Sequence, residues 1–169
     1  QPELAEYMEL KISGPGPGRA SESYINNVIK GQLKKKYTAA NKMDAELKKI
    51  YMLQGGEWSL AALTDLGQVW ENFGQTLVES YVPSYLPEAA AELYVLGLED
   101  KAYPQREKAA NFYQEAIERA FASFLYTPQT EFAVQRLGEL RPDDYPVLEE
   151  ELVDPRYTTR SELQITYEK

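Results

Sequence analysis

The chain has 169 residues, of which 43% are hydrophobic and 27% charged, a balance typical of a folded domain that needs no disulfide or metal. It contains no cysteine and no histidine, which excludes a thiol nucleophile, a zinc site of the usual ligands and a Ser-His-Asp triad. A net charge of −9 disfavours nucleic acid and anionic membrane surfaces as partners. We therefore expect protein binding without a cofactor, and no enzyme activity.

The first residues predict a strand followed by a linker. Apolar and charged residues alternate from Met8 to Ile12, the period of a half-buried strand. After Ser13, residues 14–18 alternate glycine and proline, which continue neither a strand nor a helix. We assign residues 1–20 to a strand-like arm and linker. Because Gln1 is an unusual first residue, we expect a processed or excised chain.

A helical domain is predicted over residues 21–142, because apolar residues recur there at helical intervals. Its first helix covers residues 21–53, from the N-cap Ser21 to the glycine pair that starts at Gly55, either continuous or broken near Gly31 or Asn41. The same helix carries the one basic cluster of the chain, Lys34-Lys35-Lys36. We expect this cluster on a solvated helix face rather than in a nucleic-acid site.

Prolines divide the rest of the helical domain, because proline stops a helix or occupies its first turn. The predicted helices are residues 58–81, 88–100, 104–125 and 128–140. In particular, Pro104 is expected in a first turn, so that residues 88–100 and 104–125 form a helical hairpin.

Residues 143–169 predict an acidic loop and a second strand-like tail. Residues 163–167 alternate in the same way as residues 8–12, so the two ends are expected to pair with each other, with a neighbouring domain or with a partner chain. The acidic run 149–151 lacks the spacing of a calcium-binding loop, so we expect no metal site.

Leucine-glycine pairs give the helices their most specific pattern. A tetratricopeptide (TPR) repeat carries Leu-Gly and an aromatic residue on its first helix and small residues on its second, where the helices cross closely. The residues that match these packing positions are Gly67 and Trp70 in a first repeat, and Gly97, Ala109, Tyr113 and Ala116 in a second repeat, whose first helix also carries Leu93 and Leu96. We predict a mainly α fold of TPR-like hairpins, an α-solenoid, with strand-like segments at both termini. The alternative is an ordinary helix bundle in which these residues are core.

Several short segments together resemble a known family. They are Gly56-Glu57-Trp58, Ala61-Ala62, Leu66-Gly67, Trp70, Phe73, Val82-Pro83, Glu107-Lys108-Ala109 with Tyr113, and Leu140-Arg141-Pro142 with Tyr145-Pro146 and Glu149. Over residues 35–152 the chain resembles the last repeats of deltaproteobacterial TPR envelope proteins, those of myxobacterial gliding motility in particular. The resemblance implies an extracytoplasmic scaffold of a motility or transport machine, located in the periplasm or cell envelope of a Gram-negative bacterium.

Tyrosines are the candidate contacts for a partner, because tyrosine offers contact area and a hydroxyl at low entropic cost. Tyr81, Tyr85 and Tyr94 flank the turn between the second and third predicted helices. They either cap the core at helix ends or line a groove that receives a peptide or helix.

These observations leave three functions open. A protein-binding scaffold is the leading hypothesis. The second is a structural subunit of a large assembly, joined to its neighbours by addition of the terminal strands to a sheet. The third is a carboxylate-dependent hydrolase; with 27 Asp and Glu residues in the chain, no pair is singled out.

Overall fold

The computed structural model describes residues 2–12, 14, 22–53 and 55–145 of the chain. It is mainly helical, and the described residues contain no strand. The elements are α1 (Pro2–Glu9), α2 (Glu22–Tyr24), the π-helical turn η1 (Ile25–Ile29), α3 (Lys30–Met52), α4 (Glu57–Val78), α5 (Glu88–Ser123) and α6 (Pro128–Leu140). The prediction of a mainly α protein is therefore confirmed.

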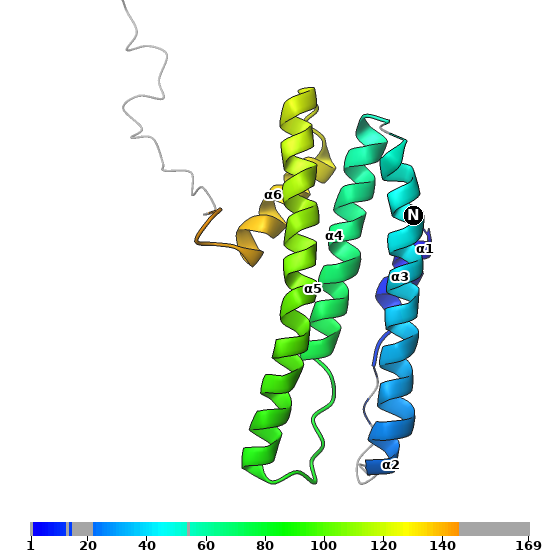
Figure 1. Cartoon of the computed structure of the whole chain (residues 1–169), viewed down its shortest axis with the longest axis vertical. Helices are drawn as coiled ribbons and strands as arrows, with labels where there is room; N and C mark the ends of the chain where they lie inside the picture. The colour runs from blue at the N-terminus through cyan, green and yellow to red at the C-terminus, as the bar shows by residue number, and fades with distance from the viewer. Residues whose placement is uncertain (1, 13, 15–21, 54, 146–169) are drawn as a thin grey trace, which may run out of the picture.

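Three long helices form the body of the molecule. Helix α4 lies between α3 and α5 and runs antiparallel to both, so α3 and α5 point the same way (Figure 1). Helix α6 packs on α5 and α4, and α1 packs on α4 and α3. Residues 22–52 are helical without a break, which confirms the first predicted helix. Its end before Gly55 is also as expected.

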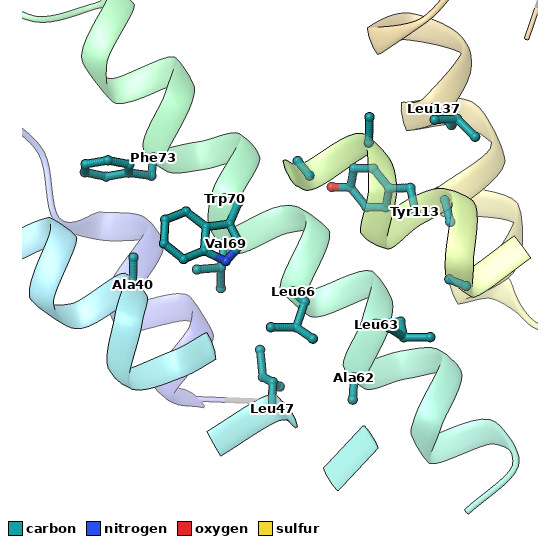
Figure 2. Close-up of a cluster of buried hydrophobic side chains, with 14 of the residues drawn as sticks. Ala40, Leu47, Ala62, Leu63, Leu66, Val69, Trp70, Phe73, Tyr113 and Leu137 are labelled. Carbon is teal, nitrogen blue, oxygen red and sulfur yellow. The ribbon is translucent and has the colours of Figure 1, made fainter. Parts of the chain in front are cut away.

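Helix α4 supplies the centre of the core, because it is apolar on several faces and covered by helices on more than one side. Figure 2 shows Leu66 and Trp70 of α4 facing Leu47 and Ala40 of α3. Tyr113 from α5 and Leu137 from α6 complete the same cluster.

The predicted N-terminal strand is wrong. Residues 2–9 form helix α1, and residues 10–12 have no regular structure. Tertiary contacts of Tyr7 favour the helix over a strand, because its side chain is buried and its hydroxyl donates to the Val69 carbonyl oxygen at 2.9 Å. Leu4 and Met8 pack against the core beside it, at the spacing of one helix face. The second predicted strand, at residues 163–167, lies outside the described residues.

The hairpin predicted at Pro104 is also wrong, because α5 continues through this proline. Proline removes one helical hydrogen bond, here the one to the carbonyl of Asp100. Both residues are exposed, so water can satisfy that carbonyl. On the opposite side of α5, the backbone of Gly74 lies close to Ala102 and Arg106: a Cβ built on Gly74 would be 3.4 Å from the Ala102 oxygen and 3.1 Å from the Arg106 Cγ.

The second TPR-like repeat is therefore wrong as well. Its two predicted helices, residues 88–100 and 104–125, belong to the single continuous helix α5. Gly97, predicted at a close helix crossing, has nothing within 4 Å of a Cβ built on it. Leu93 and Leu96, expected to pack in the same repeat, are 70% and 53% exposed. The register of this repeat is therefore incorrect, although the helical character of the segment is confirmed.

Candidate partner-binding surfaces

The predicted packing residues other than Gly97 lie in the core. Trp70, Ala109, Tyr113 and Ala116 are buried, and Gly67 lies against the Tyr113 ring. Gly67 and Tyr113 hold α4 on α5, whereas Trp70 faces α3. These residues position the surfaces described below and are not available to a partner.

A buried carboxylate, Asp44, joins the three long helices. Its Oδ1 accepts a hydrogen bond from the Trp70 indole Nε1 at 2.6 Å and lies 3.2 Å from the Lys108 Nζ, and its Oδ2 lies 2.7 Å from the Lys48 Nζ. Lys108 also sits 3.3 Å from the centroid of the Trp70 ring. Burial alone would raise the pKa of Asp44, but the bonds from Lys48, Trp70 and Lys108 lower it below its usual value.

A second polar cluster joins α4, α5 and α6. The Tyr113 hydroxyl donates to the Glu71 Oε2 at 2.8 Å, and the Arg136 guanidinium pairs with the same carboxylate. Both clusters consist of charges that are already paired inside the bundle. We interpret both clusters as structural contacts between helices rather than as reactive sites. Among the described residues, no group of three or more acidic side chains is placed to hold a metal ion.

The three candidate tyrosines do not form one surface. Tyr81 is half-buried and lies against Gly14, where an added Cβ would be 2.8 Å from the Tyr81 Cδ2. Burial raises the pKa of Tyr94, and the charge of Tyr85 raises it further. Tyr85 is 47% exposed and accessible to a partner.

Beyond the end of α4, the first turns of α5 expose an acidic and apolar surface. Leu93, Leu96 and Tyr103 are exposed and recur at helical spacing. Next to them is a shallow hollow of about 620 Å³, lined by Glu88, Ala91, Glu92, Val95, Leu96 and Glu99. We give the name α5 N-terminal face to the exposed Leu93, Leu96 and Tyr103 together with the residues that line this hollow. Residues 88–100 contain no basic residue, so the face is uniformly negative.

Sequence reasoning missed the α5 N-terminal face because it assigned Leu93 and Leu96 to a repeat core. The available signal was the charge pattern: Glu88, Glu92 and Glu99 flank these leucines without a compensating lysine or arginine.

One lysine of the predicted basic cluster is buried rather than solvated. Lys36 is 3% exposed, and its Nζ donates to the Leu10 carbonyl oxygen at 2.7 Å and lies 5.2 Å from the Tyr7 ring centroid. Burial lowers the pKa of Lys36, and the charge of Glu79 partly opposes this. Lys36 therefore connects α3 to Leu10, which directly follows α1. The expectation that this lysine lies on a solvated face is wrong.

The remaining lysines at the start of α3 form a basic surface. Lys30, Lys34, Lys35 and Lys42 are exposed, and no acidic residue precedes Asp44 in α3. Tyr37 lies at the edge of this surface: it is 47% exposed, and its ring packs on Phe73 and Trp70 of α4 with centroid distances of 5.4 and 6.3 Å. We call Lys30, Lys34, Lys35 and Tyr37 the α3 basic face.

Two further surfaces are open. At the opposite end of the bundle Leu125 lies close to Gly56, and an apolar hollow of about 240 Å³ includes the exposed Phe121 and Phe124. A groove of about 590 Å³ runs between α1 and α3 and carries charges of both signs, including Glu6 and Lys42. Neither surface has a charge pattern that selects one class of partner.

Comparison of the chain with protein-family models, with curated proteins and with solved structures finds no match. Among the described helices, none combines the length and the apolar character that crossing a membrane requires.

Proposed function

We propose that this protein is a helical scaffold that binds a basic, amphipathic segment of a partner protein on the α5 N-terminal face. The observation that carries the proposal is the exposure of Leu93 and Leu96 beside the carboxylates of Glu88, Glu92 and Glu99. Covering an exposed leucine contributes about 1.5–3 kcal/mol. A folded chain that leaves such residues in water gains this free energy only when a partner covers them.

The charge of the face defines the chemistry of the partner. Opposite charge across an interface steers association and excludes partners of like charge, so lysines or arginines are expected around an apolar stripe. The carboxylates lie at helical spacing along α5, which suits a helix laid alongside it with its own charges at the same spacing. Tyr85, which is exposed, adds contact area where the face begins.

The wider setting belongs to the proposal as well. A non-enzymatic role in a motility or transport machine of a Gram-negative envelope rests on the resemblance over residues 35–152. Partner binding on α5 needs no TPR-like solenoid, because a single continuous helix presents the face. Joining of subunits by strand addition is not proposed for the N-terminus, where α1 is a helix.

A synthetic peptide tests the proposal. We choose a helical peptide with leucines on one face and lysines beside them, and measure its affinity for the full chain by fluorescence anisotropy. Combined Glu88→Gln, Glu92→Gln and Glu99→Gln substitutions are expected to weaken binding by about tenfold or more, which corresponds to about 1.4 kcal/mol. Leu93→Ser with Leu96→Ser is expected to weaken it to a similar extent.

The matched control removes as many carboxylates elsewhere. Glu57→Gln, Glu118→Gln and Glu131→Gln change the net charge equally but lie away from the α5 N-terminal face, toward the other end of the bundle. This variant is expected to bind the peptide as the wild type does. Equal losses in both variants would mean unspecific attraction to an acidic protein and would overturn the proposal.

A further inference from the structure

Building on the proposed function, we infer that the basic segment bound by the α5 N-terminal face is the α3 basic face of a second copy of this chain. The protein would then assemble head to tail, each copy offering α5 to one neighbour and α3 to the other.

The two faces match in spacing. On α5, Glu88, Glu92, Val95 and Glu99 follow one another at intervals of four, three and four residues. On α3, Lys30, Lys34, Tyr37 and Asn41 follow at the same intervals. When two such helices lie side by side and parallel, a lysine meets a glutamate at each of the first two positions. At the third position the exposed part of Tyr37, whose ring also packs on Phe73 of its own chain, lies opposite Val95.

The fold presents these faces in the orientation that stacking requires. Helices α3 and α5 run in the same direction on opposite sides of α4, and both begin at the same end of the bundle (Figure 1). A second copy placed beside the first without rotation therefore brings its α3 start alongside the α5 start.

Such a contact uses different surfaces on its two sides, so it does not close on itself by twofold symmetry. One α5 N-terminal face and one α3 basic face remain free at the ends of every dimer, and further copies can add. Exposed ion pairs are individually weak, and the net charge of −9 opposes stacking. At about 0.15 M salt, however, charges more than about 8 Å apart are largely screened, while contacting pairs are screened less.

The test is sedimentation velocity of the full chain over a range of concentrations, with light scattering to give the mass. The wild type is expected to grow beyond a dimer as concentration rises. Reversing the α5 charges by Glu88→Lys, Glu92→Lys and Glu99→Lys is expected to leave a monomer. Reversing the α3 charges by Lys30→Glu, Lys34→Glu and Lys35→Glu is expected to do the same. Circular dichroism checks that both variants remain folded.

An equimolar mixture of the two charge-reversed variants tests directly whether the α3 basic face contacts the α5 N-terminal face. In the mixture, the unchanged lysines of one variant face the unchanged glutamates of the other, and the reversed faces also have opposite charges. Assembly is therefore expected to return in an equimolar mixture although neither variant assembles alone. This recovery cannot arise if a substitution acts by unfolding the chain.

Each other outcome overturns the inference in a recognisable way. A wild type that stays monomeric but binds the basic peptide overturns self-assembly and leaves the proposed function standing. A mixture that stays monomeric, or assembly that survives both reversals, shows that these faces do not meet. Assembly lost only on Phe121→Ser with Phe124→Ser assigns the contact to the other end of the bundle. If the peptide also fails to bind, the proposed function fails separately.

Discussion

The ring of Tyr113 lies directly against the backbone of Gly67. A Cβ built on Gly67 would be 2.3 Å from the Tyr113 Cε1, a distance that no side chain tolerates. One turn further along α4, Glu71 accepts the hydrogen bond from the Tyr113 hydroxyl at 2.8 Å. The glycine and the carboxylate together fix the position of the tyrosine, and hence the spacing of α4 and α5.

Gly67→Ala is expected to destabilise the protein by about 1–3 kcal/mol, because the new methyl group must displace the Tyr113 ring from a packed core. The control is Gly97→Ala, at a site with nothing within 4 Å. There alanine is expected to stabilise α5 by up to about 1 kcal/mol, because it is the better helix former. Urea unfolding measures both, and a destabilised Gly97→Ala would contradict the open site.

Asp44 is expected to make the protein sensitive to acid. Its folded pKa lies below the ordinary value of 3.8, so its contribution to stability is present above that value and is lost as the pH falls through the folded pKa. Asp44→Asn removes both lysine pairings and is expected to cost about 1–3 kcal/mol at neutral pH. It should also flatten the acid limb of the stability profile. Lys49 also lowers the pKa of Glu46, but this pair is exposed and screened by solvent, so Glu46→Gln should change that limb much less.

Tyr7 is expected to contribute to the alkaline limb, together with Tyr113, whose pKa burial also raises, and to govern the attachment of α1. Burial raises the pKa of Tyr7 above the ordinary 10.0, so its contribution to stability is present below pH 10 and is lost as the pH rises further. Tyr7→Phe removes the bond to Val69 and is expected to cost about 1 kcal/mol. Faster amide hydrogen exchange in α1 checks this. Tyr126→Phe, at a side chain that is 71% exposed, should change neither property.

Phe124 follows α5 in the left-handed backbone region, with φ 53°, and its side chain is 95% exposed. Phe124→Gly is expected to raise stability by about 1 kcal/mol, because glycine adopts this conformation without steric cost and little packing is lost. Phe121→Gly, inside the helix, is expected to lower stability by a similar amount. If thermal unfolding shows Phe124→Gly to be destabilising, the residue has packing contacts that its exposure does not indicate.

Local pattern predicted most of the helical body and part of its packing. The apolar period placed a helix over residues 21–53, and the Leu-Gly pair at Gly67 correctly indicated a close helix contact there. Local pattern failed at the helix limits, because the alternation at residues 8–12 and the proline at position 104 each fit more than one structure. It also failed for the candidate site, since helical spacing alone does not say which turns of α5 another element covers.

By itself, the sequence determined that this protein is mainly helical, acidic and free of histidine and cysteine chemistry, because composition and a period of 3.6 residues are local properties. The tertiary structure alone decided that α5 runs through Pro104, that Lys36 is buried, and that Glu88 and Leu96 share an open face. Each of these depends on contacts, or on missing contacts, between residues far apart in the chain. The free energy of such contacts outweighs the local preference of a proline or a lysine.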